Sequence, residues 1–346
     1  MKKYYSGIIT GFLLLTGYNS GDCQDVHFSQ YYQTPLIINP ALTGVFSGDQ
    51  RGIINYRNQW TDFAPFTTYS LSVDSRILKK KLKDKYFGAG LFLYHDEAGD
   101  NKLSTTQAHI SLSSTIEIAK NHSLSAGLQG GIAQKVMNGG SFKWGSQYDG
   151  LGYDPTKSGE SAYFENYTFG DFSAGVTWSF GKSETNISSN DYLGATAGFA
   201  VYHINTPKQG IDLEKLSREF VIHGSVVIGM KGKPLALIPS ILFLNQGPLK
   251  EVNVGGLIRY AIKRESKYTG FLKAVSVYGG IYYRTGDAII PTFLMEVANY
   301  ALGLSYDMNV SALNEASNGN GAFEISLRFI NPDPFKHKGY NKRPLM

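Results

Sequence analysis

The stretch Tyr300–Val310, with the sequence YALGLSYDMNV, alternates large apolar residues with small or polar ones along its whole length. Because successive side chains of a β-strand point to opposite faces, this pattern predicts a strand with one apolar face and one polar face. The same alternation recurs near the C-terminus, where Phe323, Ile325, Leu327 and Phe329 interleave with Glu324, Ser326 and Arg328.

Segments of this kind fill most of the chain, and the sequence predicts about fourteen strands with almost no helix between them. The expected ranges are 51–60, 66–76, 86–96, 103–118, 122–137, 170–181, 192–204, 219–230, 234–245, 251–263, 273–284, 288–297, 299–310 and 322–330. Strands of about ten residues with apolar side chains outward and polar side chains inward are typical of a transmembrane antiparallel β-barrel. The alternative is a soluble β-sandwich, whose strands also alternate. Strand length and the small polar residues of the inner face favour the all-β membrane barrel.

An even number of strands places both ends of a barrel on one side of the membrane. We therefore expect both termini to be periplasmic, with odd-numbered connections facing outward. The longest connection, 138–169, and two further long ones, 205–218 and 311–321, are odd-numbered. The sequence thus predicts an outer-membrane barrel over 51–330 and a polar periplasmic tail over 331–346.

Residues 1–23 are typical of a secretory signal peptide, with Lys2 and Lys3 before a short apolar stretch and small or polar residues up to Cys23. Cleavage after Cys23 gives a mature chain that starts at Gln24; lipid attachment at Cys23 is the alternative. Cys23 is the only cysteine, so the mature chain has no disulfide. The apolar stretch is far shorter than the roughly 20 residues of a spanning helix.

The composition differs from that of an ordinary soluble domain, and we predict no nucleic-acid partner. Charged residues make up 18% of the chain, below the roughly 25% of soluble domains, and the net charge is only +5. The lysines of 79–85 and the basic residues of the tail are interpreted as a solvated turn and a solvated end that set topology and solubility, with binding of anionic lipid or nucleic acid as the alternative. We expect outer-membrane lipid around the barrel.

The N-terminal segment, residues 24–50, contains the sequence HFSQYYQTPLIINPALTG at 27–44. Pro35 and Pro40 fix local backbone angles, so the block is expected to be extended and rich in turns. Its apolar side chains require a surface to cover, which is either the lumen of this barrel or a partner chain. Arg57 alternates with Asn55 and Gln59 and is predicted to face the lumen and bind the segment, whereas Trp60 is predicted to lie at the membrane interface. The candidate contact residues are Phe28, Gln30, Tyr31, Asn39, Pro40, Arg57 and Trp60.

This combination resembles the PorP/SprF family of Bacteroidota outer-membrane proteins, which belong to the type IX secretion and gliding-motility machinery. The residues that carry the resemblance are Phe28, Ser29, Gln30, Tyr31, Pro35, Leu36, Asn39, Pro40, Ala41, Gly44, Tyr56, Arg57, Gln59, Trp60, Ser72, Val73 and Asp74. The resemblance implies a barrel that supports secretion or surface retention of an adhesin with a type B C-terminal sorting domain. It also implies contact with periplasmic peptidoglycan-binding components of the machinery.

The long connection 138–169 concentrates aromatic residues among glycine and serine. Such residues on an adaptable loop suit recognition of a protein or glycan, and a loop that folds on itself or covers the pore is the alternative. The candidate outer-loop contacts are Trp144, Tyr148, Tyr153, Tyr163 and Phe164.

The sequence gives little support to catalysis. The seven histidines show no metal-ligand spacing, and no nucleophile elbow, phosphate loop or paired-cysteine motif occurs. We therefore predict no catalytic residue, no metal and no cofactor, with a serine–histidine pair assembled across strands as the open alternative. Lumen charges are expected to form a satisfied inner network, namely Glu117, Lys135, Arg284, Asp307, Glu324 and Arg328.

The functional hypothesis is a non-enzymatic barrel that engages an exported surface protein. A passive porin or solute transporter is the alternative from another class. A porin conducts ions and binds no surface protein, whereas the secretion hypothesis predicts a closed lumen and a partner.

Overall fold

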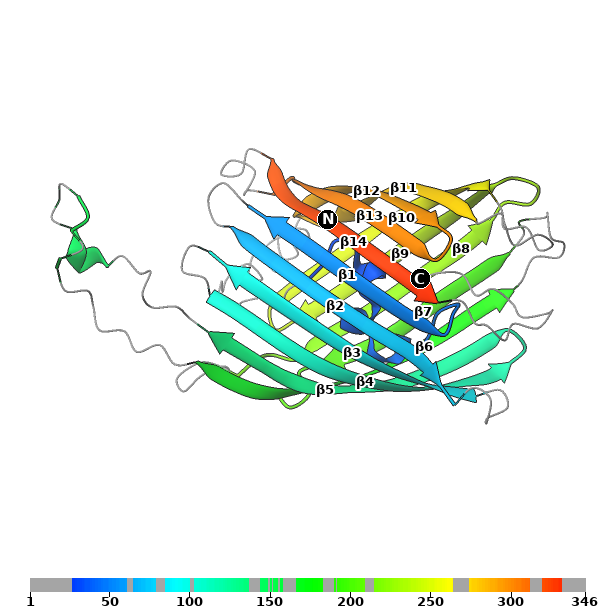
Figure 1. Ribbon diagram of the computed structural model, residues 1–346, viewed down its shortest axis with the longest axis horizontal. Coiled ribbons are helices and arrows are strands. Elements are labelled where there is room, and N and C mark those ends of the chain that lie inside the picture. Colours follow the sequence, from blue (N-terminus) through cyan, green and yellow to red (C-terminus); the bar gives the residue numbers. More distant parts are fainter. Residues whose placement is uncertain are drawn as a thin grey trace, which may run out of the picture.

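The computed structural model is a closed antiparallel barrel of fourteen strands, in which each strand pairs with its sequence neighbours and β1 pairs with β14 (Figure 1). The structure describes residues 27–60, 65–78, 85–99, 103–136, 144–148, 150, 152–154, 156–157, 166–182, 190, 192–208, 215–263, 274–311 and 319–331. The strands are β1 (Gln50–Gln59), β2 (Phe66–Ile77), β3 (Lys85–Ala98), β4 (Leu103–Ala119), β5 (His122–Val136), β6 (Tyr167–Lys182), β7 (Leu193–Tyr202), β8 (Glu219–Gly229), β9 (Leu235–Gln246), β10 (Leu249–Lys263), β11 (Val275–Arg284), β12 (Ala288–Val297), β13 (Tyr300–Asn309) and β14 (Asn320–Asn331).

The predicted fold class is confirmed, and every expected strand lies within three residues of an observed one. The largest difference is at the start of β6, which begins at Tyr167 because Tyr167 pairs with Lys135 of β5. The barrel closes along ten paired positions, from Gln50 opposite Asn331 to Gln59 opposite Ala322. The start of β1 and the end of β14 therefore lie at the same rim.

The outer wall is a belt of exposed apolar side chains. On β4 and β5, Ile110, Leu112, Leu128 and Ile132 are all more than half exposed. The alternate positions, such as Ser111, face the lumen and are buried. This division is the one that hydrocarbon imposes on a barrel wall, because a closed barrel leaves no backbone hydrogen-bonding group unpaired at an edge. No helix among the described residues is long and apolar enough to cross a bilayer.

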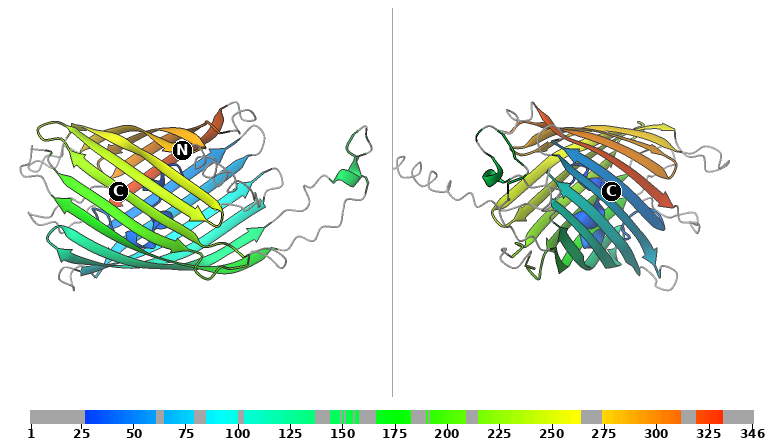
Figure 2. Two further views of the ribbon diagram at one scale, coloured as in Figure 1. Left: turned by 180° about the vertical axis from the view of Figure 1, so that it is seen from behind. Right: turned by 60° about the vertical axis from the view of Figure 1, so that its left-hand side comes forward.

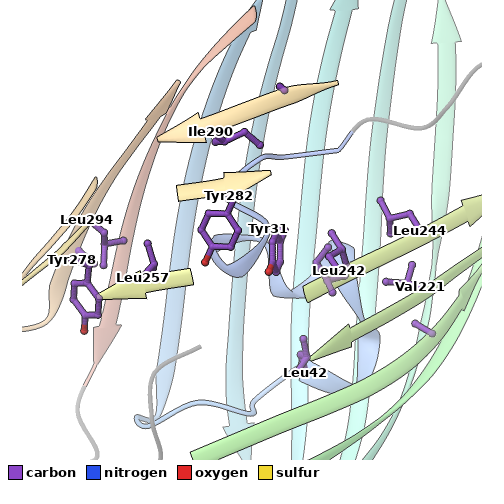
Figure 3. Close-up of a cluster of buried hydrophobic side chains, with 14 of the residues drawn as sticks. Tyr31, Leu42, Val221, Leu242, Leu244, Leu257, Tyr278, Tyr282, Ile290 and Leu294 are labelled. Atoms are coloured by element: carbon purple, nitrogen blue, oxygen red, sulfur yellow. The ribbon is translucent and has the colours of Figure 1, made fainter. Parts of the chain in front are cut away.

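The sequence predicts polar side chains on the whole inner wall, and the structure shows them on only part of it. The lumen face of β1–β6 is mainly polar, with Ile53 and Phe92 among its buried apolar residues, whereas that of β7–β13 carries a large apolar cluster (Figure 3). On β9, Leu242 and Leu244 face inward while Ile241 is exposed outward, so this strand is apolar on both faces. The buried wall residues of the cluster are Ala200, Tyr202, Val221, Leu242, Leu244, Leu257, Tyr278, Tyr282, Ala288, Ile290, Leu294 and Ala301. They are apolar because they pack against the N-terminal segment rather than against water.

Residues 27–46, here called the lumen segment, lie inside the barrel as three short helical turns (Figure 1 and Figure 2). These turns are η1 (Tyr31–Gln33), α2 (Pro35–Ile38) and η2 (Pro40–Leu42). The predicted extended segment is thus helical over three turns, which is a correction. The reason is local, since Pro35 and Pro40 each start a turn, where a proline loses no intrahelical hydrogen bond. The predicted signal peptide, residues 24–26 and the tail after Asn331 lie outside the described residues.

A charged substitution on the outer wall tests the membrane assignment. Ile110, near the middle of β4, is 62% exposed. We expect Ile110→Arg to lower the free energy of unfolding from lipid vesicles by about 2–4 kcal/mol, the cost of an arginine at the bilayer midplane. Denaturant titration in vesicles measures this change. Tyr148→Arg, at an exposed site beyond the strands, is the matched control and should change stability little; an equally small effect of Ile110→Arg would contradict the assignment.

Candidate functional site

The lumen segment folds locally through its own side chains. Asn39 has an extended backbone between α2 and η2, and its Oδ1 accepts a hydrogen bond from the backbone N–H of Ala41 at 2.9 Å. This is an N-cap, which satisfies a donor that the first turn of a helix leaves open. At the C-terminal ends of η1 and η2, the Thr34 and Thr43 hydroxyls donate to the carbonyls of Tyr31 and Pro40. These bonds set the local shape of the turns, and contacts with the wall hold the turns in place.

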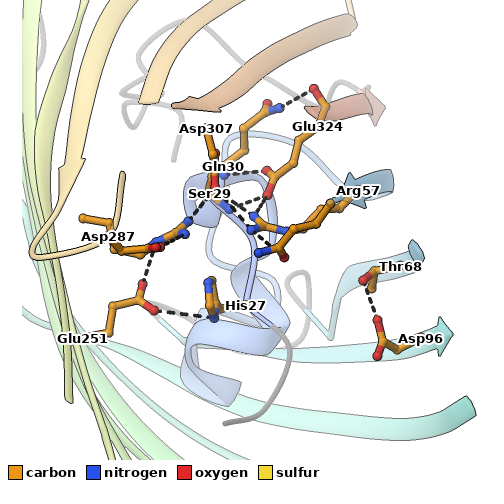
Figure 4. Close-up of polar contacts among 12 residues, drawn as sticks. His27, Ser29, Gln30, Arg57, Thr68, Asp96, Glu251, Asp287, Asp307 and Glu324 are labelled. Carbon is orange, nitrogen blue, oxygen red and sulfur yellow. Dashed lines mark hydrogen bonds and ion pairs between the residues drawn. The ribbon is translucent and has the colours of Figure 1, made fainter. Parts of the chain in front are cut away.

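A carboxylate of the last strand holds the start of the lumen segment (Figure 4). Glu324 accepts hydrogen bonds from two successive backbone N–H groups, that of Ser29 at 2.6 Å and that of Gln30 at 2.9 Å. The side chain of Gln30 extends the contact, donating to the Glu324 carbonyl at 3.2 Å and accepting from the Ser326 hydroxyl at 2.8 Å. Hydrogen bonds to an ionised acceptor are among the strongest in proteins.

Two arginines meet at the Ser29 hydroxyl, and Arg57 compensates the charge of Glu324. Arg57 pairs with Glu324 and lies 3.2 Å from Asp307, while Arg284 lies 3.2 Å from the same Asp307 oxygen. Ser29 Oγ accepts from Arg57 at 2.8 Å and from Arg284 at 2.5 Å, and donates to Asp307 at 2.7 Å. All these side chains are buried. We call Ser29, Gln30, Arg57, Arg284, Asp307 and Glu324 the first polar cluster.

A second polar cluster, formed by Leu42, Gly44, Phe46, Arg51, Asp74 and Arg76, holds the end of the lumen segment. Arg51 and Asp74 pair through two bonds of 2.9 and 2.8 Å, and Asp74 also accepts from the Gly44 N–H at 2.7 Å. Arg51 and Arg76 donate to the carbonyls of Leu42 and Gly44. Both guanidinium groups lie over the Phe46 ring, at 4.6 and 5.3 Å from its centroid.

Asn39 fixes the middle of the lumen segment to the opposite wall. It is fully buried, and its Nδ2 lies 3.0 Å from the Val176 carbonyl, 3.0 Å from the Thr177 hydroxyl and 3.1 Å from Nε2 of His223. Two wall glycines make this approach feasible. A Cβ atom at Gly175 would lie 2.1 Å from Asn39 Oδ1, and one at Gly198 would lie 2.8 Å from Nδ2. Any other residue at these positions would displace the amide.

The apolar side of the lumen segment packs on β9–β11. Tyr31 meets Tyr282 edge to face with ring centroids 5.7 Å apart. Burial raises the pKa of Tyr31 and the neighbouring Tyr282 adds to the shift, so the hydroxyl keeps its proton. That hydroxyl donates to Ser240 Oγ at 2.8 Å. The segment is thus held by hydrogen bonds to charged wall groups on one side and by aromatic and aliphatic contacts on the other.

Two small cavities, each of about 60 Å³, border the lumen segment at α2. The first lies toward β8–β12 and is lined by Tyr31, Tyr32, His223, Leu257 and Tyr278 among others. The second is lined by Phe28, Phe92, His109, Tyr202 and His203 among others. Cavities of this size hold a few water molecules. The segment fills the lumen beside them, since Asn39 and wall side chains such as Asn55, Ser111 and Thr177 are buried.

Six of the seven predicted contact residues come together in the lumen. Phe28, Gln30, Tyr31, Asn39 and Pro40 belong to the lumen segment, and Arg57 bonds to its Ser29 as expected. Their contact with a separate protein stays a prediction. Trp60 lies apart, just after β1, with its ring 5.4 Å from that of Phe66 in an edge-to-face arrangement.

The described outer-loop aromatics contact one another. Tyr148 and Tyr153 form an isolated β-bridge with rings 5.7 Å apart, next to η4 (Gly145–Gln147), and both are exposed. Trp144 precedes η4 and donates its backbone N–H to the Gln147 side chain. Tyr163 and Phe164 lie outside the described residues. Recognition by this loop stays a prediction.

The inner charge network differs from the predicted one. Arg284, Asp307 and Glu324 belong to it and Arg328 pairs with Glu296, whereas Glu117 is exposed. The second polar cluster was missed, although Asp74 belongs to the residues of the family resemblance. The sequence also did not identify Gly175 and Gly198 as contact sites for the segment, because a glycine in a strand does not show what packs against it. Asp171 and His203 form a further buried contact of 2.9 Å. Among the described residues, no group of three or more His, Cys, Asp and Glu is placed to hold a metal ion.

Glu324→Gln should loosen the lumen segment. The change removes the buried charge that pairs with Arg57 and accepts the backbone N–H groups of Ser29 and Gln30. Removing one partner of a buried pair costs about 3–5 kcal/mol. A loss of about 3 kcal/mol raises the open population roughly 100-fold. We expect an Ala41→Cys reporter, fully buried in the closed state, to react correspondingly faster with a membrane-impermeant maleimide.

Asp287→Asn is the matched control for this experiment. Asp287 pairs with the same Arg284 at 2.8 Å but is 34% exposed, so its loss should change the labelling rate little. Equal rates in the Glu324→Gln and Asp287→Asn proteins would show that the first polar cluster does not hold the segment.

Comparison with known proteins identifies the family. A family model described as type IX secretion system membrane protein PorP/SprF matches residues 20–329. No curated protein matches. Among solved structures, the Ralstonia pickettii toluene transporter TbuX is 8% identical with a TM-score of 0.44, covering 86% of this chain and 91% of that one. A Pseudomonas aeruginosa FadL homologue is 12% identical with a TM-score of 0.42, covering 84% and 92%.

These structural likenesses are too weak to carry a functional argument. The family match spans nearly all of the described barrel together with the lumen segment. It therefore includes both polar clusters and the strands that supply them. This chain belongs to the PorP/SprF family of type IX secretion system membrane proteins.

Proposed function

We propose that this barrel is a non-enzymatic accessory of type IX secretion that engages an exported cell-surface protein for secretion or surface anchoring. The client class is an adhesin or another protein with a type B C-terminal sorting domain. Gliding motility is the process in which such surface adhesins would act.

The occupied lumen is the observation that supports this proposal. The segment makes charged contacts at both of its ends and an amide contact in its middle, all of them buried. A passive porin instead requires a water-filled channel. A barrel whose lumen is filled by its own chain offers its rims and outer connections as binding surfaces.

The orientation belongs to the same proposal. β1 starts and β14 ends at one rim, opposite the connections between β5 and β6 and between β7 and β8. With the terminal rim in the periplasm, the aromatic loop at Tyr148 and Tyr153 faces the client outside the cell. Periplasmic peptidoglycan-binding components would contact the terminal rim and the tail 331–346.

Deletion of residues 27–44 tests whether the lumen segment closes the barrel. We expect single-channel conductance in a planar bilayer to rise several-fold, because the deletion removes the side chains that fill the lumen and leaves the strands intact. Heat-modifiable migration in gel electrophoresis serves as the folding control. Unchanged conductance of a folded barrel, together with loss of a bound protein, would place the segment in an interface instead.

Affinity purification in mild detergent from the native membrane tests the client. We expect a large surface protein with a C-terminal sorting domain to co-purify in stoichiometric amount, as identified by mass spectrometry. The double variant Tyr148→Ala with Tyr153→Ala should reduce its recovery. Tyr300→Ala is the control, since Tyr300 is similarly exposed (57% against 53% for Tyr148) but lies at the terminal rim. A clean barrel that conducts ions would favour the porin.

A further inference from the structure

The outer wall of the barrel carries a recess across strands β3–β7, the lower wall in Figure 1. Its volume is about 740 Å³, more than ten times that of either lumen cavity. The outward-facing residues at its centre are Leu112, Ser114, Ala126, Leu128, Ala174 and Val176. Most of these are apolar, and Leu112 and Leu128 are more than half exposed.

The strand register explains why the wall is hollow here. Phe87, Ser114, Ala126 and Val176 are direct neighbours across four strands, so one outward row has large residues at its ends and small ones in its middle. Phe199 continues the row beyond Val176. Side chains on one face of adjacent strands stand about 5 Å apart, so two consecutive small residues leave a gap that their neighbours do not fill.

The inward row behind the recess is also made of small residues. Gly88, Ser113, Gly127 and Gly175 are neighbours in the same register. The lumen segment presses directly on their backbone. A Cβ atom at Gly127 would lie 2.4 Å from the Pro40 carbonyl carbon, and one at Gly88 would lie 2.4 Å from the Thr43 carbonyl oxygen. The wall is therefore one backbone thick at this point and is supported from inside, so the recess cannot close by inward packing.

The surroundings of the recess decide what fills it. The recess lies within the belt of exposed apolar side chains, where the medium is hydrocarbon. Three exposed lysines lie at the adjoining rim, namely Lys85 at the start of β3, Lys120 after β4 and Lys182 at the end of β6. Lys120 and Lys182 are six positions along their strands from Ser114 and Val176, or about 20 Å. This matches an anionic group at the membrane surface with a hydrocarbon chain extending into the bilayer.

We propose that the recess binds one acyl chain of an anionic phospholipid, whose phosphate lies against Lys85, Lys120 and Lys182. The acyl chain covers Ser114 and Ala126 and packs between Phe87 and Val176. Only the strand backbone separates the lipid from Pro40 and Thr43. The lipid therefore lies directly behind the part of the wall that the lumen segment contacts. The site needs only that the barrel spans a membrane.

Native mass spectrometry of the full-length barrel, titrated with palmitoyl-oleoyl phosphatidylglycerol in detergent, tests the site. Ala126→Phe fills the recess from its centre. We expect the wild-type barrel to retain one phosphatidylglycerol at concentrations at which the Ala126→Phe barrel retains none, with at least a tenfold difference in apparent affinity. Gly279→Phe is the matched control and should bind as the wild type does, because Gly279 faces outward on β11 and a Cβ atom there meets nothing within 4 Å.

A second variant keeps the test decisive if Ala126→Phe fails to fold. Replacement of Lys85, Lys120 and Lys182 by glutamine leaves the wall unaltered and should weaken phosphatidylglycerol binding at least tenfold, while binding of zwitterionic palmitoyl-oleoyl phosphatidylcholine changes little. Equal retention of phosphatidylglycerol by the wild-type, Ala126→Phe and triple-glutamine barrels would overturn the proposal. Loss of binding in Gly279→Phe as well would show a nonspecific lipid shell and overturn it equally.

Discussion

The ion pair between Arg57 and Glu324 connects β1, β14 and the lumen segment, and the rest of the structure depends on this connection. The two residues are direct neighbours across the seam where β1 meets β14, so the pair forms only when the barrel closes. The same carboxylate accepts the backbone N–H groups of Ser29 and Gln30. Closure of the wall and docking of the lumen segment are thereby coupled through one buried group. An isolated carboxylate or guanidinium in this site would be strongly destabilising, because burial leaves its charge uncompensated.

The lumen segment has a polar side and an apolar side, and each side faces a part of the wall with matching side chains. Its backbone and Ser29 meet charges on β1, β11, β13 and β14, whereas Tyr31, Ile38 and Leu42 meet the apolar wall of β7–β13. The apolar contacts stabilise the docked segment by burying apolar surface, but they do not fix its orientation. The polar clusters fix the position and orientation of the segment, since each hydrogen bond requires a particular donor in a particular place. Together they hold a chain of short turns that has too few internal bonds to persist alone.

Local periodicity predicted the strands and their faces, whereas contacts between distant residues could not be predicted from the sequence. Alternation in Tyr300–Val310 identifies a strand because neighbouring residues carry the whole signal. It placed Arg57 in the lumen, but its partner Glu324 is 267 positions away. On β9 the periodicity is uninformative, since Leu242 and Ile241 are both apolar and face opposite sides. The resemblance to a family marked Asn39, yet its four contacts with β6–β8 join residues 137 to 184 positions apart in the sequence.

The manner in which the segment is held bears on the kind of function that the barrel can perform. Withdrawal of the segment would break the bonds of Glu324 with Ser29 and Gln30 and those of Asp74 with Gly44, and would expose wall glycines such as Gly127. Buried charged groups would then lose their hydrogen-bond partners. Hydrocarbon cannot replace these partners, and water can replace them only if it fills the lumen. A closed resting state is therefore the stable one, and transport of small solutes would have to overcome it at every opening. Binding of a client at the rims needs no such step. The closed lumen thus favours a role in recognition over one in permeation.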